Sequence, residues 1–177
     1  MWAIVEDNEI TETFSNLKGL VIDNIQYSRN ILSSRWSEAE RNAIGVYTIV
    51  DDNSNRKDQE FYTNTDVSYA FADGEVTASY GIATPKELSG LKTEKKKLIK
   101  QQASALLTTT DWYIIKAVDV ESYSAPANIV TYRTNIRSKS NEMESKIDAC
   151  TTVDELAALY VYTDGSRPLG EFPTLEV

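Results

Sequence analysis

Residues 67–106 read VSYAFADGEVTASYGIATPKELSGLKTEKKKLIKQQASAL, and the spacing of their apolar side chains changes near residue 84. Before that point, larger and smaller side chains alternate on both sides of Asp73-Gly74, a dipeptide that favours a tight turn. Alternation with a period of two predicts an antiparallel hairpin over residues 67–82, with one face buried and the other in water. After that point, apolar residues recur at three- and four-residue steps, which predicts a helix.

This helix is predicted to begin at Thr84. Thr84 suits the N-cap, Pro85 suits the first helical position, and Glu87 completes a capping box. Polar residues interrupt its expected stripe, so we expect it to pack on one side only. The stripe comprises Leu88, Leu91, Lys95, Leu98, Gln102 and Ala105, widened by Ile99 and Leu106.

A second long helix is predicted after Pro126, which suits a helix start. Its stripe alternates strictly between four- and three-residue steps. The members are Ile129, Arg133, Ile136, Ser140, Met143, Ile147 and Cys150. A short helix over residues 112–118, capped by Thr110 or Asp111, precedes it, and a capping box at residues 152–155 opens another.

Strand signals recur in the first part of the chain, at residues 2–5, 10–14, 20–22, 25–27, 46–50 and 61–63. The first four runs predict two hairpins, because residues 6–9 and 23–24 contain Asp and Asn, which tolerate left-handed turn conformations. One short helix follows them, with a capping box at residues 37–40 and Gly45 as its C-terminal stop. Residues 51–59 are expected to form a polar loop.

Together these patterns predict an α+β protein with three parts. Residues 1–83 form a small, mostly antiparallel β-module with one short helix. Residues 84–162 form an antiparallel α-helical hairpin, and residues 163–177 form an irregular C-terminal tail. Hydrophobic residues make up 41% of the chain, which suffices for a core.

The composition excludes several mechanisms. The 177 residues include no histidine, so Ser-His-Asp catalysis and an HExxH zinc site cannot be built. Cys150 is the single cysteine, and its place at the end of an apolar stripe indicates a small buried hydrophobe. We expect no enzymatic activity, no metal and no cofactor. An enzyme would have to gather some of the 27 acidic residues in a deep pocket.

The net charge of −9 argues against nucleic acid as a partner, because DNA binding depends on basic contacts to phosphate. We also expect no membrane association, since no run approaches the ~20 apolar residues of a membrane helix and the first residues lack a signal-peptide pattern. One basic run stands out, formed by Lys92, Lys95, Lys96, Lys97 and Lys100. A solvated helix face is the preferred interpretation, and a docking patch for an acidic partner is the alternative.

One motif of the helical part resembles a known family. Asp111-Trp112-Tyr113 is followed, after Pro126, by Tyr132-Arg133 and Ile136-Arg137. This order resembles the "DW…YR..LR" pattern near the end of tail-fibre assembly proteins and related tail proteins of tailed bacteriophages. Ile136 stands where that pattern usually has Leu, and the chain continues well past Arg137.

A second resemblance lies nearer the N-terminus. Residues 36–40 (WSEAE) and 43–47 (AIGVY) are similar to a module of tail-associated phage proteins, including marine ones, and residues 138–144 also look like that group. The resemblance implies a non-enzymatic tail structural or assembly protein, located in the virion or, during assembly, in the host cytoplasm. Its expected partners are a tail fibre, baseplate or other virion subunit, and further copies of the chain.

The resemblance and the residue chemistry together select six candidate structural or partner-binding residues: Trp36, Asp111, Trp112, Tyr132, Arg133 and Arg137. Asp111 can cap the short helix, and Trp112 can bury its ring between helices. Arg133 lies on the apolar stripe, so it needs an acidic or carbonyl partner, because an unpaired buried charge is costly. The alternative is that these residues only hold the hairpin together.

The alternative function is a carbohydrate-binding receptor-recognition module at a tail tip. Tyr62, Tyr69 and Tyr80 lie in the strand region and could line a sugar-binding surface. Tyrosine is also common in strands for packing reasons, and that interpretation is preferred.

Overall fold

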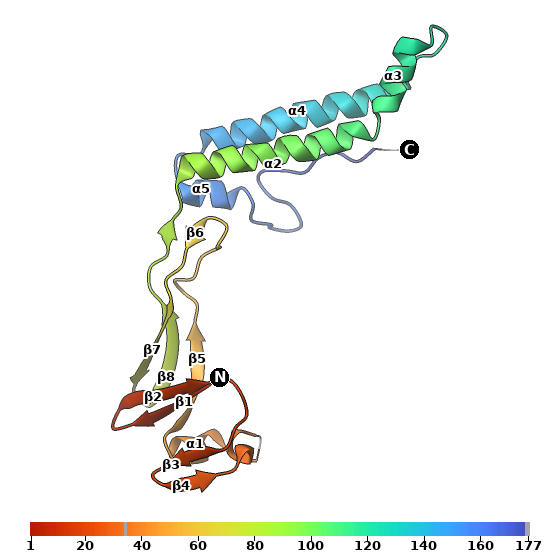
Figure 1. Ribbon diagram of the computed structural model, residues 1–177. Helices are drawn as coiled ribbons and strands as arrows, with labels where there is room; N and C mark the ends of the chain where they lie inside the picture. Colours follow the sequence, from red (N-terminus) through yellow and green to blue (C-terminus); the bar gives the residue numbers. More distant parts are fainter. Residues whose placement is uncertain (34, 176–177) are drawn as a thin grey trace. The chain divides into compact units, whose positions relative to one another are not determined.

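The structure is a computed structural model that describes residues 1–33 and 35–175. The chain divides into two compact units, residues 1–84 and residues 85–177. The N-terminal unit is built mainly from strands and the C-terminal unit from helices (Figure 1), so the predicted α+β class is confirmed.

Five strands of the N-terminal unit form one sheet, in the order β2-β1-β5-β8-β7. The strands are β1 (Trp2–Glu6), β2 (Glu9–Phe14), β5 (Val46–Asp52), β7 (Val67–Ala72) and β8 (Glu75–Tyr80). The β5–β8 pair is parallel and the other pairs are antiparallel, as a mostly antiparallel module requires. Strand β5 continues through Asp52, so the polar loop expected from residue 51 begins later than predicted.

Smaller elements flank this sheet. Strands β3 (Leu20–Ile22) and β4 (Ile25–Tyr27) form a separate hairpin. A 3-10 helix, η1 (Arg29–Leu32), and helix α1 (Glu38–Asn42) follow it. The predicted capping box of α1 is present: the Glu40 amide donates to Ser37 Oγ and the Ser37 amide donates to the Glu40 carboxylate, which lowers the pKa of Glu40.

The hairpin turns form for the reason that the sequence indicates. The central residues of all three turns have positive φ, the conformation that a two-residue hairpin with the natural strand twist requires. The φ angles are 51° and 65° at Asp7 and Asn8, 50° and 61° at Asp23 and Asn24, and 53° and 79° at Asp73 and Gly74. The three predicted hairpins are therefore confirmed, although the one predicted over residues 67–82 ends at Tyr80.

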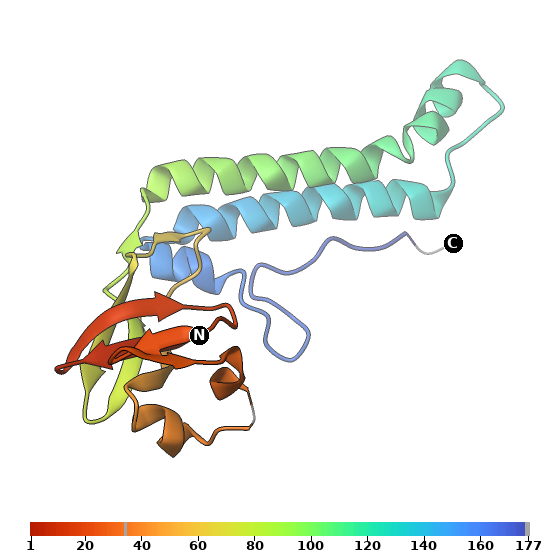
Figure 2. The same ribbon diagram turned by 60° about the horizontal axis from the view of Figure 1, so that its bottom comes forward.

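Strand β1 is buried on both faces. Ile4 packs into one apolar cluster with Phe14, Leu20 and Val46. Its neighbours Ala3 and Val5 point to the other face, into a cluster that includes Ile49, Val76 and Ala78. The edge strands β2 and β7 contact each other, so the sheet curls around this second cluster (Figures 1 and 2). The N-terminal core therefore forms around β1.

Gly45 joins α1 to β5 beside strand β1. The Val5 amide donates to the Gly45 carbonyl oxygen at 2.8 Å. Gly45 has φ +77°, and a Cβ atom placed on it would lie 2.6 Å from the Val5 carbonyl oxygen. Glycine is thus required both by the left-handed backbone and by the close approach of β1.

The C-terminal unit contains two long helices, α2 (Leu88–Thr108) and α4 (Ala127–Ala149). They pack side by side and run antiparallel (Figures 1 and 2). Their ion pairs give the register: Lys96 lies 2.7 Å from Asp148, and Lys100 lies 3.2 Å from Glu144. The shorter helices are α3 (Asp111–Asp119), between the long ones, and α5 (Val153–Ala158), after them.

The predicted stripe of α4 is confirmed at every position, because all seven of its members, including Cys150 at the C-cap, are buried. The predicted stripe of α2 is wrong in part. Its buried row follows a four-residue step, Leu91, Lys95, Ile99 and Ala103. Leu98 is 47% exposed, since only a narrow strip of α2 faces α4.

The predicted start of α2 is also wrong. Thr84 and Pro85 form a short strand, β9 (Thr84–Pro85), which pairs with β6 (Tyr62–Thr63). Glu87 is the N-cap instead, and its carboxylate accepts hydrogen bonds from the amides of Ser89 and Gly90. These bonds lower the pKa of Glu87 because they stabilise its charged form.

The segment after α5 is irregular, as predicted, but it is packed against the helices. Leu169 is buried, and its amide donates to the Leu159 carbonyl oxygen at 3.0 Å. Phe172 and Leu175 pack beside Tyr132 on α4. The last described residues therefore cover one side of the helical hairpin.

Gly45→Ala should lower the free energy of unfolding by about 2–4 kcal/mol, because it adds a steric clash with β1 to the cost of a left-handed backbone. Gly74→Ala is the matched control, since Gly74 has φ +79° and open space around its Cβ position. It should cost only about 1 kcal/mol. Urea unfolding of both variants measures the difference, and equal losses would show that the close approach to Val5 has no energetic effect.

Candidate functional site

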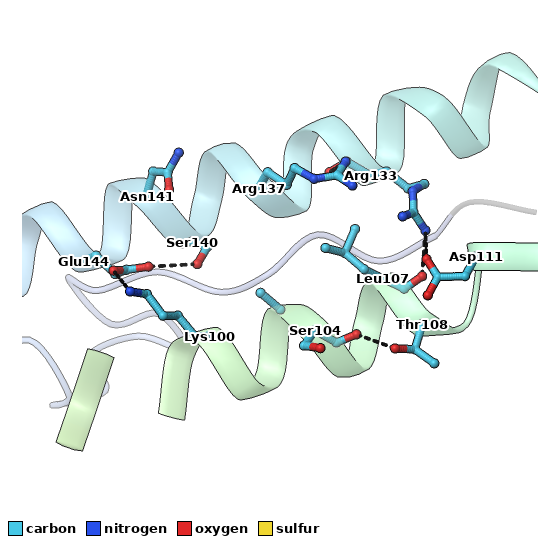
Figure 3. Close-up of a pocket in the computed structure, with 11 residues that line it drawn as sticks. Lys100, Ser104, Leu107, Thr108, Asp111, Arg133, Arg137, Ser140, Asn141 and Glu144 are labelled. Atoms are coloured by element: carbon cyan, nitrogen blue, oxygen red, sulfur yellow. Dashed lines mark hydrogen bonds and ion pairs between the residues drawn. The ribbon is translucent and has the colours of Figure 1, made fainter. Parts of the chain in front are cut away.

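An open groove of about 530 Å³ lies between α2 and α4 (Figure 3). Helix α4 contributes Arg133, Arg137, Ser140, Asn141 and Glu144, and the start of α3 contributes Asp111. The remaining lining residues come from α2: Lys100, Ala103, Ser104, Leu107 and Thr108. The floor is partly apolar and the walls carry charged and hydrogen-bonding groups.

Arg133 is the central residue at one end of the groove. Its side chain is only 10% exposed, and its Nη1 atom lies 2.8 Å from Asp111 Oδ1. The same nitrogen donates to the Leu107 carbonyl oxygen and to Thr110 Oγ1, both at 2.7 Å. The expected acidic and carbonyl partners of Arg133 are therefore confirmed. We call Arg133, Leu107, Thr110 and Asp111 the Arg133 cluster.

The Arg133 cluster connects three helices. Leu107 is in the last turn of α2, Thr110 is the N-cap of α3, and Arg133 belongs to α4. Thr110 is buried, and its hydroxyl also donates to the Leu107 carbonyl oxygen at 2.9 Å. The cluster therefore satisfies backbone and side-chain groups at the break between α2 and α3, and it holds α4 against that break.

The opposite end of the groove is closed by a second ion pair. Glu144 lies 3.2 Å from Lys100 Nζ, and Ser140 Oγ donates to Glu144 Oε1 at 3.3 Å. Both carboxylates of the groove, Asp111 and Glu144, thus have a basic partner. The negative charges of these two carboxylates are therefore neutralised by Arg133 and Lys100.

Arg137 lies between these two pairs and has no such partner. Within the described chain, its guanidinium makes a long hydrogen bond of 3.4 Å from Nη1 to the Arg133 carbonyl oxygen. No carboxylate of the described chain lies within ion-pair distance of its guanidinium. Arg137 is exposed and lines the groove, so the groove presents a cation that has no carboxylate partner in the described chain. This arrangement suits an anionic group of planar shape, such as a carboxylate.

The described residues contain no group of three or more His, Cys, Asp or Glu side chains that could hold a metal ion. Cys150 is buried, and burial raises the pKa of its thiol, which disfavours the reactive thiolate. Its interpretation as a small buried hydrophobe is supported. The Ser140 hydroxyl contacts a carboxylate in the groove, that of Glu144, which is already paired with Lys100.

The six candidate residues do not form one site. Asp111, Arg133 and Arg137 line the groove. Tyr132 is buried against Ala103 and Ile136, with the C-terminal segment packed beside it. Trp36 belongs to the N-terminal unit, where its ring meets Tyr27 edge-on at 6.1 Å and packs against the β1 cluster.

The prediction that Trp112 is buried between helices is wrong. Trp112 is 52% exposed, and its ring lies against that of Tyr113, with centroids 4.0 Å apart. The physical reason is that none of the nine residues of α3, all of which the structure describes, is buried. The helix therefore offers the tryptophan no core to enter. Ile115 and Val118 of the same helix are exposed as well.

The lysines of the basic run on α2 make more contacts within the protein than a fully solvated helix face would. Lys95 is buried, with its Nζ 4.3 Å from the Tyr160 ring centroid. Lys92 donates to the Asp148 carbonyl oxygen and Lys96 pairs with the Asp148 carboxylate. Lys97 and Lys100 remain exposed.

The three strand tyrosines do not form an exposed aromatic surface. Tyr62 is buried, and Tyr69 packs against the second apolar cluster of the sheet. Tyr80 is partly buried, and the Arg56 guanidinium lies 5.5 Å from its ring centroid. Their positions fit the packing role that the sequence favoured.

The sequence does not reveal the roles of three residues in the groove and the Arg133 cluster. Thr110 was considered only as a cap, although it is a buried acceptor for Arg133. In the sequence, Lys100 is one of five lysines in a basic run, and Glu144 belongs to a segment that carries only a family resemblance. The pairing of Lys100 with Glu144 depends on the register of two helices, which no local signal gives.

Comparison of the chain with protein-family models, curated proteins and solved structures gave no match. Among the described residues, no helix combines the length and apolar character that crossing a membrane requires.

Arg133→Ala should lower the free energy of unfolding of the helical unit by about 2–4 kcal/mol, because it leaves the Leu107 carbonyl and Thr110 hydroxyl without their buried donor. Arg137→Ala, one helical turn away, is the matched control and should change stability by less than about 0.5 kcal/mol. Asp111→Asn should cost at most about 1 kcal/mol, since the Asp111 side chain is 44% exposed. Thermal and urea unfolding followed by circular dichroism measure all three, and a loss for Arg137→Ala equal to that for Arg133→Ala would contradict the assignment.

Proposed function

We propose that the chain is a non-enzymatic, tail-associated structural or assembly protein of a tailed bacteriophage, which acts through protein–protein contacts. The observation that carries the contact role is the exposed apolar surface of α3. Trp112, Ile115 and Val118 are all exposed on this nine-residue helix. Clustered exposed apolar side chains mark interaction surfaces more often than isolated ones do.

The spacing of these residues supports a helical contact face. Trp112, Ile115 and Val118 recur at three-residue steps, so they lie along one side of α3. Burying them against a partner would contribute roughly 25 cal/mol per Å² of apolar area removed from water. Tryptophan is also the residue type most often found to dominate such interfaces. A partner with a complementary apolar groove is the chemistry that fits this face.

The base of α3 is held in place by the Arg133 cluster. Asp111 is the first residue of α3, and its ion pair with Arg133 ties that end to α4. A contact face on an anchored helix loses less conformational freedom on binding than one on a loose segment. The stabilising role and the contact role are therefore compatible, and they involve adjacent residues.

The phage assignment is supported by the resemblance of the Asp111-Trp112-Tyr113 and Tyr132-Arg133 motifs to tail-fibre assembly and tail-associated proteins. These motifs contain both the exposed tryptophan and the arginine that anchors its helix. The implied partners are a tail fibre, a baseplate or another virion subunit. Mass spectrometry of purified particles with copy-number estimation distinguishes a permanent component, which is retained, from a transient assembly factor, which is absent.

The contact face is tested by a photo-crosslinking amino acid at position 112 during particle assembly. A crosslink to a tail subunit is the expected result. Val161 is the matched control position, because it is apolar and exposed but lies outside α3. Crosslinks at both positions, or at neither, would count against α3 as the contact face.

Trp112→Ala combined with Ile115→Ala should reduce the binding of the chain to its tail partner by tenfold or more, in line with the ~2 kcal/mol or more attributed to interface hot spots. Unfolding free energy should change by less than about 0.5 kcal/mol, since neither side chain is buried. Quantitative co-purification from assembling particles and a urea titration provide the two readouts. Unchanged co-purification would refute the contact role while leaving the fold intact.

A further inference from the structure

The two units of the chain carry very different charge. Residues 1–84 contain 14 acidic and 6 basic side chains, and residues 85–177 contain 13 and 12, so the net charges are −8 and −1. Nearly all of the net charge of −9 therefore lies on the N-terminal unit. The chain offers both a strongly acidic surface and helices with exposed cations.

The acidity is concentrated at one end of the sheet. Strand β1 is antiparallel to β5, strand β7 is antiparallel to β8, and β5 and β8 are parallel, so β1 and β7 run in the same direction. The turns that follow β1 and β7 therefore lie at the same end of the sheet. Strands β2 and β7 also contact each other, which brings these turns side by side (Figures 1 and 2). The turns carry five exposed carboxylates, which we call the acidic edge: Glu6, Asp7, Glu9, Asp73 and Glu75.

The carboxylates of the acidic edge are unpaired in the described part of their unit. No ion pair joins any of its five carboxylates to a basic group of the described residues. Within the same part of the chain, no three acids are arranged to hold a metal ion. Like charges so close together repel one another, and the repulsion is relieved when an external cationic surface approaches.

The groove between α2 and α4 offers such a surface. Arg137 has no carboxylate partner among the described residues, and Lys100, although paired with Glu144, has a side chain that is 67% exposed. A second hollow on α2 adjoins the groove, shares Lys100 and Ser104 with it, and adds Lys97. We call Lys97, Lys100 and Arg137 the basic groove. Arg137 can take a carboxylate with two parallel hydrogen bonds, and the two lysines extend the positive charge along α2 toward the other end of the groove.

We propose that the acidic edge of one copy docks into the basic groove of a second copy. A single chain carries both complementary surfaces, so the occupant suggested by the charges is the chain itself. The contact is head-to-tail, because the two surfaces differ, and it leaves one free surface of each kind at the ends of a dimer. Further copies extend the assembly into a ring or a filament. This proposal does not depend on the phage assignment or on the apolar face of α3.

The physics predicts a weak and salt-sensitive association. Exposed ion pairs contribute roughly 0.2–1 kcal/mol each, so a few of them give modest affinity. Sedimentation velocity and light scattering of the full chain should show mass rising with protein concentration at about 20 mM NaCl, where the Debye length is about 20 Å. The mass should fall to that of the monomer at about 500 mM NaCl, where the Debye length is about 4 Å.

Two charge-reversal variants locate the surfaces. The edge variant carries Glu9→Lys and Glu75→Lys, and the groove variant carries Lys97→Glu and Arg137→Glu. Each should remain monomeric at low salt. Two control variants carry the same charge changes elsewhere. Asp119→Lys with Glu121→Lys matches the edge variant, and Arg29→Glu with Arg35→Glu matches the groove variant. Both controls should self-associate with an affinity within about threefold of that of the unmodified chain, as expected for charges outside the contact. Circular dichroism verifies that all variants fold.

Mixing the two variants distinguishes the proposed geometry from others. The edge variant keeps its groove and the groove variant keeps its acidic edge, so the mixture should form a 1:1 dimer that cannot grow further. This outcome supports the proposal. A monomeric unmodified chain at low salt, association that survives in either variant, or a mixture without heterodimer would overturn it. If the unmodified chain stays monomeric yet Arg137→Glu abolishes binding to a different acidic protein, the occupant is that protein and the self-association proposal fails.

Discussion

The helical unit depends on one constraint: a guanidinium removed from water must be given acceptors. Arg133 is 10% exposed on its side chain and is surrounded by oxygens from residues 107, 110 and 111. An uncompensated charge at that depth would cost several kcal/mol. The requirement therefore fixes where α2 ends, how α3 begins and which turn of α4 lies opposite them. Ile136, Met143 and Ile147 are also buried, but apolar contacts have no preferred direction. The hydrogen bonds of Arg133 depend on distance and angle, so they constrain the register of the helices more tightly.

Much of the fold follows from local patterns, and the reasons differ between elements. The hairpin turns are predictable because Asp, Asn and Gly are the residues that accept positive φ. The stripe of α4 is predictable because α2 and the C-terminal segment cover it from both sides, so a wide and regular set of positions is buried. Only a narrower strip of α2 is buried, and it includes the aliphatic part of a lysine side chain, Lys95. The spacing of apolar residues alone therefore predicts some of the wrong buried residues for α2. Helix α2 begins later than the local capping signal predicts, because Thr84 and Pro85 pair with β6 in a long-range contact.

The candidate site shows the same division. Arg133 could be identified because a charged residue on an apolar stripe needs a partner, and that reasoning concerns one helix only. The identity of the partners of Arg133, and the pairing of Lys100 with Glu144, require the register of helices that are separated by roughly twenty to forty residues in sequence. The burial of Trp112 was predicted from its residue type, whereas its true exposure depends on what lies against α3. In the described chain nothing buries that helix. Large apolar residues that a sequence places in a core can therefore be surface residues whose partner is another molecule.

Arg133 and Arg137 show how burial decides the use of a side chain. They are the same residue type on the same helix, one turn or roughly 6 Å apart. Arg133 lies against the break between α2 and α3, where oxygen atoms of the protein replace the water that its guanidinium loses on burial. Its charge is therefore compensated within the fold. Arg137 lies over the open groove, keeps its water and has no carboxylate near it in the described chain, so its charge remains available. A guanidinium that is already hydrated loses little when an anionic group replaces that water, and it gains a planar, directional partner. Stability and recognition can therefore be altered separately on this helix, because the two arginines differ in solvent access although they share sequence context.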